Sequence, residues 1–355
     1  MVVSVTEVAL EGRGHLAFAN PPLLAAWATV AGKKETQGPL GRHFDRIVRD
    51  ETMGEKTFER AERKLFTSAV ELVLSLSGRH ASDVDLIFAG DLLDQIVTAN
   101  FAARDIGIPL VGVYGACSTS SESLLLAAMS VASGTARRAI AATASHHMSA
   151  ERQYRYPIEL GVQRLPTSQW TATGAAAFLV EDAREARSQK APAQGDGPTL
   201  RIVSATVGRV QDYGIKDPNN MGAAMAPAAA DTILRHLQGS GHAVEDFDLI
   251  LTGDLGRVGH PLLELLLAEE RIHPKERLRD AGILLYAPDQ AVDAGGSGAA
   301  CSALVCGAMA LPRLRRGEMR RMLLVATGSL HSPRTYQQGE SIPTIAHAVE
   351  VEAVR

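Results

Sequence analysis

The segment GACSTSSES, residues 115–123, places a cysteine where an apolar run gives way to a helix. The run VGVY precedes it, and Leu124, Leu125 and Met129 follow at helical spacing. A thiol at a helix start meets free N–H groups and the positive end of the helix dipole, and both favour the thiolate. We therefore expect Cys117 to have a lowered pKa, the first requirement of a cysteine nucleophile.

The same segment is also a candidate anion site. The N–H groups at a helix start bind carboxylates without any need for a nucleophile. Here Ser118, Thr119 and Ser120 supply such N–H groups together with their hydroxyls. Taken from the residues alone, a reactive thiol and an anion cradle both remain open.

A second candidate region is HHMSAERQYRYPIELGVQRLPTSQWTATG, residues 146–174, which is dense in imidazole, guanidinium and aromatic groups. It lies between two predicted strands and is long for a connection, which indicates either a binding function or a subunit interface. We expect some of Arg152, Arg155 and Arg164 to form internal ion pairs, with Glu151 and Glu159 as the candidate partners.

The elements that carry these residues occur twice. DVDLIFAGD at 83–91 is answered by DFDLILTGD at 246–254, and the strand–helix patterns that follow match in order. Short, continuously apolar strands alternating with helices predict an α/β fold whose sheets are covered on both faces. We expect an N-terminal half at 1–182, a polar linker at 183–198 and a C-terminal half at 199–355, with a cleft where the strand ends meet.

In the first copy we expect a helix near 93–105, and in the second copy helices near 223–238, 261–271 and 298–315. We also expect a strand at MLLVAT in the second copy, and the segment IAHAVEVEA at 345–353 matches TGAAAFLVED at 173–182 at the end of the first.

Composition excludes several classes of protein. The 355 residues are 46% hydrophobic and 21% charged, with a net charge of −4 and no block of like charges, so neither nucleic acid nor an anionic membrane surface is an implied partner. Cys117, Cys301 and Cys306 have neither a disulfide nor a metal-ligand spacing. No secretory signal or membrane-spanning run is expected.

Motifs along nearly the whole chain resemble the SpoVAD family (stage V sporulation protein AD) of the thiolase and ketoacyl-synthase superfamily. They are GDLLDQIVTAN, GACSTSSES, AERQYRYPIELG, SATVGRV, MGAAMAPAAADTI, LTGDLGRVGHP, GGSGAACSA, VATGSL and IAHAVEVE. The resemblance implies a duplicated thiolase-like αβαβα fold of five layers. It also implies a role in accumulating dipicolinic acid (pyridine-2,6-dicarboxylic acid) in the forming spore and releasing it on germination.

The resemblance also implies where catalytic partners of the cysteine should lie. The superfamily has a His after the second-half strand and an Asn or His in the glycine-rich turn before the last long helix. This chain has Asp254 and, six residues on, His260 at the first place, and Gly296 and Ser297 at the second. His260 precedes a proline and fits a surface residue at a helix start. We therefore expect a non-enzymatic binding protein, with an acyl-thioester-handling enzyme using Cys117 as the alternative.

Dipicolinate is a flat dianion, so its site should combine donors that fork onto carboxylates with flat surfaces for the ring. We expect the ligand to be bound as the free dianion or as its calcium chelate, without a cofactor or a protein-held metal. The partners implied are other SpoVA proteins and a second copy in a homodimer, with peripheral attachment to the spore inner membrane through those partners. The ligand-binding candidates are Cys117, Ser118, Thr119, His146, His147, Arg152, Arg155, Trp170 and His347.

Overall fold

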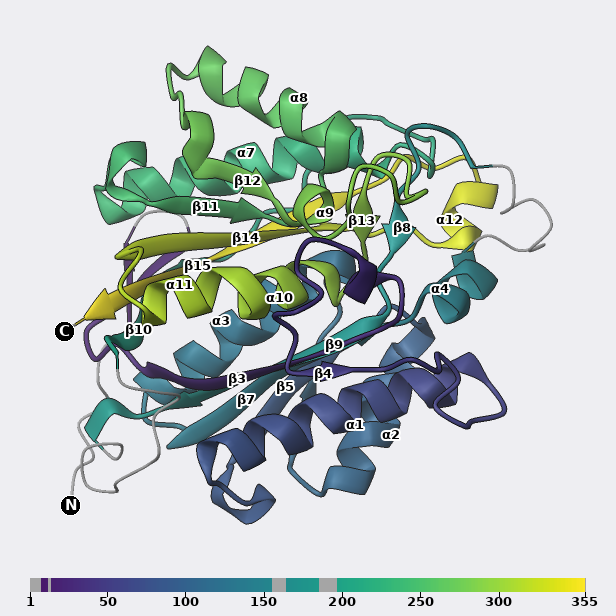
Figure 1. Ribbon diagram of the computed structural model, residues 1–355. Helices are drawn as coiled ribbons and strands as arrows, with labels where there is room; N and C mark the ends of the chain where they lie inside the picture. Colours follow the sequence, from purple (N-terminus) through teal and green to yellow (C-terminus); the bar gives the residue numbers. More distant parts are fainter. Residues whose placement is uncertain (1–7, 12–13, 155–163, 185–196, 355) are drawn as a thin grey trace.

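A computed structural model describes residues 8–11, 14–154, 164–184 and 197–354 as stacked layers of helices and sheet (Figure 1). Two outer helical layers and one central helical layer alternate with two blocks of sheet. Each interface between layers holds a cluster of buried apolar side chains. The mixed α/β fold and its five layers agree with the expectation.

The first half builds the lower sheet in Figure 1, with strands in the order β6-β5-β7-β9-β3. Strands β5, β6 and β7 run parallel, and β9 pairs antiparallel with both β7 and β3. Helices α1 and α2 cover its outer face. The bounds are β3 Leu23–Ala31, β5 Leu86–Gly90, β6 Leu110–Gly112, β7 Arg138–Ser145, β9 Gly174–Glu181, α1 Phe58–Ser77 and α2 Val97–Ile106.

The second half repeats this plan as β12-β11-β14-β15-β10. Here β11, β12 and β14 are parallel, and β15 is antiparallel to β14 and β10. Helices α7 and α8 form the upper outer layer in Figure 1. The bounds are β10 Thr199–Thr206, α7 Met221–Ser240, β11 Leu249–Thr252, α8 Gly256–Glu269, β12 Leu278–Asp280, β14 Arg321–Ser329 and β15 Thr344–Val354.

Between the sheets lies a layer of helices that follow the chemistry-bearing turns. From the first half comes α3, and from the second a continuous helix whose middle turn widens to π geometry. The bounds are α3 Thr119–Ala132, α10 Cys301–Val305, the π turn Cys306–Ala310 and α11 Leu311–Arg315. This confirms the helix expected at 298–315. The turn before α3 and the turn before α10 both lie at one end of the middle layer.

Smaller elements complete the chain. They are β1 Val8–Glu11, β2 His15–Phe18, β4 Arg46–Ile47, α4 His147–Tyr154, β8 Trp170–Thr171, α9 Ala281–Leu284, β13 Gly296–Ser297 and α12 Pro333–Gln337. Short 3₁₀ turns lie at 35–37, 81–83, 94–96, 116–118, 244–246 and 275–277. The described helices include none long and apolar enough to cross a bilayer.

Two helix boundaries differ from expectation, each because of a buried carboxylate. Helix α8 begins at Gly256 rather than near 261, since Asp280 accepts hydrogen bonds from the N–H groups of Leu255 and Gly256, at 3.0 and 2.9 Å. His260 consequently lies inside the helix. Helix α2 begins at Val97 rather than 93, because the turn before it is held by Asp91, which accepts from the N–H of Ala99 at 2.8 Å.

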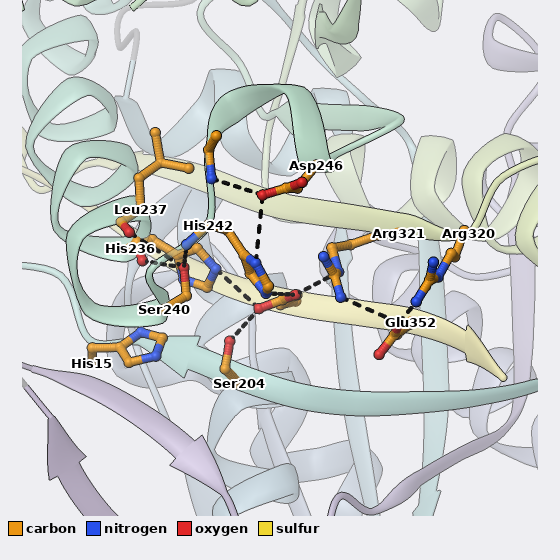
Figure 2. A network of polar contacts seen from close by, with 12 residues as sticks. His15, Ser204, His236, Leu237, Ser240, His242, Asp246, Arg320, Arg321 and Glu352 are labelled. Atoms are coloured by element: carbon orange, nitrogen blue, oxygen red, sulfur yellow. Dashed lines mark hydrogen bonds and ion pairs between the residues drawn. The ribbon is translucent and has the colours of Figure 1, made fainter.

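A network of polar side chains joins the elements of the second half (Figure 2). At its centre is the buried Glu350 of β15, which accepts a 2.5 Å hydrogen bond from Ser204 and lies 3.3 Å from His236 and 3.0 Å from Arg321. Although burial alone would raise it, these hydrogen bonds hold the pKa of Glu350 below its usual value. His15 of β2 reaches the same network through Thr206, which hydrogen-bonds both His15 and His236.

Candidate functional site

Cys117 lies in the first turn that follows β6 in the chain, where the backbone reverses direction and enters α3. The turn is tight: Ala116 has a left-handed backbone with φ of 51°, a conformation that costs an L-residue about 1–2 kcal/mol. The thiol is 6% exposed and packs in a small apolar cluster with Leu92, Ala150 and Ala299. Cys117 therefore lies at the start of a helix, as expected from the sequence, but its side chain is buried.

The carboxyl group of Asp254 faces this thiol from the second half. Asp254 follows β11, has a left-handed φ of 66° and is fully buried. Its carboxyl interacts with the thiols of both Cys117 and Cys301. Among the described residues no N–H or O–H donates to either of its carboxyl oxygens. A buried carboxyl thus stands where the superfamily resemblance implied a histidine.

Burial raises the pKa of Cys117 well above its usual value, and the neighbouring Asp254 raises it further. Burial likewise raises the pKa of Asp254. The expectation of a lowered thiol pKa is therefore wrong. The helix start does act in the expected direction, but removing a thiolate from water costs more than the N–H groups return. Burial therefore favours the protonated form of both groups.

One backbone donor does point at the sulfur. The N–H of Gly298 donates to Cys117 Sγ at 3.2 Å. Gly298 has φ of 104°, and a Cβ there would lie 2.8 Å from Ser145 Oγ and 2.9 Å from the methyl of Thr171. Ser145 secures the same turn by accepting from the N–H of Ala300 at 3.1 Å. Only glycine fits this approach.

The hydroxyls expected to form an anion cradle donate inward. Ser118 Oγ donates to the carbonyl of Gly115 at 2.6 Å, and Thr119 Oγ1 donates to that of Ala116 at 2.7 Å. The N–H groups of Ser118 and Thr119 also bond to these two carbonyls. The tight turn thus uses the donors of Ser118 and Thr119 itself, and their role as ligand contacts stays a prediction.

Two of the candidate histidines are held in other places. His146 Nε2 donates to the carbonyl of Glu51 at 2.9 Å, and His347 Nδ1 accepts from the N–H of Gly208 at 3.1 Å. Burial lowers the pKa of both imidazoles, that of His347 to about 4. The described hydrogen bonds join neither ring to Cys117, and their roles as ligand contacts stay predictions.

His147 and Trp170 are brought together. Their rings stack with centroids 3.6 Å apart and planes 2° from parallel. Two cations lie over the same indole, Lys34 Nζ at 3.9 Å and the Arg164 guanidinium at 5.2 Å from its centroid. Strand β8, which carries Trp170, pairs with β13 immediately before Gly298. This pairing connects the cation–aromatic cluster to the turn whose Gly298 N–H contacts Cys117.

The arginines of the 146–174 region pair internally, as expected in part. Arg164 lies 2.7 Å from Asp293 and 3.4 Å from Glu151, one of the two partners expected. Arg152 pairs with Glu59, where it lines a surface cavity of about 340 Å³ between α1, α2 and α4. Arg155 and Glu159 lie outside the described residues.

Sequence reasoning missed Lys34 and did not assign a role to Asp254. Asp254 carried a signal, because it directly follows a strand at the place where a catalytic imidazole was sought. Lys34 carried none, since it meets Trp170 only through folding of residues far apart in the chain. On the other side of Cys117, Tyr154 donates to the carbonyl of Leu92 at 2.6 Å and lies near the His331 ring, at 5.6 Å between centroids.

The fold is similar to that of solved OleA structures. A crystal structure of a glutamate variant of Xanthomonas campestris OleA aligns with a TM-score of 0.60 and 16% identity, covering 95% of this chain and 99% of that one. A Cys-to-Ser variant of the same protein, with bound lauric acid and lauroyl-CoA, aligns with a TM-score of 0.57 and 15% identity over 94% of this chain and 99% of that one. At these identities the likeness extends to the thiolase-like fold alone.

Sequence comparison is more specific. Stage V sporulation protein AD of Bacillus subtilis (strain 168) is 45% identical over 343 residues, 97% of this chain and 98% of that protein. The sequence model of the family described as stage V sporulation protein AD (SpoVAD) matches residues 12–352. The chain therefore belongs to the SpoVAD family of sporulation proteins.

Proposed function

We propose that this protein binds dipicolinate without catalysis, within the SpoVA system that loads the forming spore and releases its contents on germination. The observation that carries the proposal is the pairing of Cys117 with the Asp254 carboxyl. A condensing enzyme needs a thiolate and a proton-handling partner. Here both groups are buried, burial favours their protonated forms, and the described hydrogen bonds join no imidazole to the thiol of Cys117.

The same chemistry suits a bound carboxylate. A protonated carboxyl, a thiol and a backbone N–H are donors that hydrogen-bond an anion without placing a second negative charge against it. Asp254 accepts no N–H or O–H hydrogen bond among the described residues, and its protonated form, which burial favours, would donate to a bound carboxylate. The neighbouring Lys34, held over the Trp170 ring, adds a positive charge.

Calorimetry tests the ligand. Dipicolinate should bind more tightly than benzoate or the 2,3- and 3,5-dicarboxylate isomers, because only the 2,6 arrangement presents both carboxylates and the ring nitrogen on one edge. Titrations with and without calcium separate the free dianion from the chelate. Equal weak binding of all four compounds would end the proposal.

A matched pair of variants tests the site. If the protonated form that burial favours is the one that binds, Asp254→Asn keeps a donor of the same shape and should bind within a few-fold of wild type. Asp254→Leu removes the donor and should bind about tenfold or more weakly. Equal affinity of both variants with wild type would place the ligand elsewhere.

Acyl transfer is the second candidate function, favoured by the strained turn at Ala116 and the N–H of Gly298 on the sulfur. Incubation with an acyl-CoA followed by mass spectrometry separates the two. An enzyme gains an acyl mass that Cys117→Ser loses, whereas a binding protein stays unmodified while it still binds dipicolinate.

For partners we propose a homodimer formed at the free edge of β6, together with attachment to the spore inner membrane through other SpoVA proteins. Val111 on that edge strand is 41% exposed, and Tyr114 and Phe101 beside it are 42% and 45% exposed. Exposed apolar edges favour pairing with another chain, and a lysine blocks it. Val111→Lys should therefore shift sedimentation to the monomer, while Val210→Lys, at a residue 58% exposed on another segment, should not.

The membrane arm of the proposal is tested by fractionating spores. The protein should sediment with inner membranes when the other SpoVA proteins are present and remain in the supernatant when they are absent. Sedimentation with membranes in both cases would show direct attachment instead.

A further inference from the structure

The loop that follows β3 places a lysine over the aromatic cluster beside Cys117. Lys34 is half-buried, and its Nζ lies 3.9 Å from the centroid of Trp170 while donating to the carbonyl of Ala291 at 3.3 Å. Among the described residues it contacts this carbonyl and the indole, while Glu35, Glu51 and Asp293 act on its charge from further away. Arg164 on the same indole is different, because Asp293, Glu151 and the carbonyl of Gln169 already occupy its guanidinium.

The position of Lys34 is fixed from both sides. The Trp170 ring under it is stacked on His147 and held by the pairing of β8 with β13. Its own loop is bound to the segment after Trp170, since the N–H of Gly32 donates to the carbonyl of Thr173 at 2.8 Å and Glu35 accepts from the N–H of Thr173 at 3.1 Å. The ammonium is therefore preorganised rather than free in solvent.

A partly buried cation without a carboxylate partner is costly. Burial lowers the pKa of Lys34, and the positive charge of Arg164 lowers it further, against the opposing effects of Glu35, Glu51 and Asp293. An anion bound here would stabilise the charged ammonium, which burial disfavours. The aromatic face holds the ammonium in place while leaving donors for the anion.

We propose that Lys34 is the residue that binds one carboxylate of an aromatic dicarboxylate at the rim of the Cys117 site, an inference that rests on the proposed function. Strand β13 connects the two ends of the site, because it pairs with Trp170 and leads directly into Gly298, whose N–H contacts Cys117. The second carboxylate of the ligand then lies toward Asp254. The phosphates of coenzyme A share the same anionic chemistry and form the other arm of the test.

The neighbouring Lys33 provides a matched control, since it is exposed and its replacement changes the net charge equally. Calorimetry with dipicolinate compares wild type, Lys34→Gln, Lys34→Arg and Lys33→Gln. Lys34→Gln should bind about ten- to a hundredfold more weakly. Lys34→Arg should recover part of the loss, and Lys33→Gln should stay within about twofold of wild type, with a charge effect that fades at high salt. Unchanged thermal unfolding of Lys34→Gln shows that the variant is folded.

A protection experiment supplies a second readout. Dipicolinate should slow acetylation of Lys34 by acetic anhydride and leave that of Lys33 unchanged, as followed by mass spectrometry. Equal binding by Lys34→Gln and Lys33→Gln, without protection, overturns the inference and leaves the proposed function standing. Failure of wild type to bind dipicolinate, with Lys34-dependent binding of coenzyme A, overturns the dicarboxylate assignment and the proposed function together.

Discussion

At the scale of single residues, the surroundings of Cys117 decide its chemistry more than its place at a helix start does. The thiol meets a buried carboxyl and apolar side chains instead of water and an imidazole. Both conditions favour the protonated sulfur. A cysteine that occupies the position of a nucleophile therefore stays a protonated thiol, which can donate a hydrogen bond.

Iodoacetamide should accordingly leave the native protein almost unmodified at about pH 8, because alkylation requires the thiolate. All three cysteines are buried, so unfolding in denaturant should expose every one to rapid reaction. Mass spectrometry of Cys117→Ser assigns the site. Fast alkylation of native Cys117 alone would show that its pKa is lowered after all.

The sequence was sufficient to locate Cys117, Trp170 and His147, because each lies in a motif with a recognisable neighbour. It was not sufficient for the direction of the thiol pKa. That depends on Asp254, more than a hundred residues further along the chain, and on burial that only packing of the two halves produces. Lys34 was missed for the same reason, since its contact with Trp170 has no local pattern.

At the scale of elements, apolar periodicity predicted the strands and most helices well, and it failed where a side chain caps a helix from a distance. Asp280 starts α8 early, and Asp91 delays α2 by holding the turn before it. Within that turn Gln95 and Ile96 have left-handed backbones, with φ of 56° and 47°. Nothing in the local sequence announces such strain, since neither residue is glycine.

Gln95→Gly should relieve part of this strain and raise the free energy of unfolding by about 0.5–1 kcal/mol, because glycine adopts positive φ without steric cost. The control is Glu71→Gly, at an exposed position inside α1, which should lower stability by about 1 kcal/mol. Urea unfolding midpoints compare the two. Destabilisation by both glycines would show that the Gln95 turn is unstrained.

At the scale of the whole molecule, β10 joins the two halves, because its Arg201 pairs with Leu23 of β3. The thirteen described strands of the main sheet are therefore continuous. The Figure 2 network fastens the same region, linking β2, β10, α7, β14 and β15. The sequence indicated the duplication, but it did not indicate that β10 pairs with β3 and joins the two halves.

This junction should make stability depend on pH. Burial, assisted by His236, lowers the pKa of His15 to about 4. Between that value and the usual 6.5 the unfolded chain binds a proton that the folded protein refuses, so stability falls as pH falls. The loss is about 2 kcal/mol between pH 7 and pH 5.

His15→Gln should remove most of that loss while keeping a hydrogen bond to Thr206. Carboxyl groups with raised pKa act in the opposite sense, so the difference between variant and wild type is the quantity to measure. Thermal unfolding at several pH values gives it. Parallel curves for the two proteins would contradict a neutral, buried His15.

The loop after β3 joins two ionisable neighbours with opposite surroundings. Lys34 faces the rim, while Glu35 is wholly buried and receives a 2.5 Å hydrogen bond from Tyr286. Burial raises the pKa of Glu35 to about 7, against the hydrogen bonds from Tyr286 and Thr173, with Glu51 adding a small increase. In mildly acidic solution Glu35 is neutral and only the more distant Glu51 and Asp293 act against the charge of Lys34, whereas above neutrality a further negative charge appears at the neighbouring residue.

Affinity for dipicolinate should therefore weaken several-fold as pH rises from about 6 to about 8, and Glu35→Gln should flatten the curve. Persistence of the full pH dependence in that variant would assign it to another group. If the dependence belongs to Glu35, one short loop makes the strength of ligand binding depend on pH. A protein that takes up its ligand in an acidic compartment would release it as its surroundings turn alkaline.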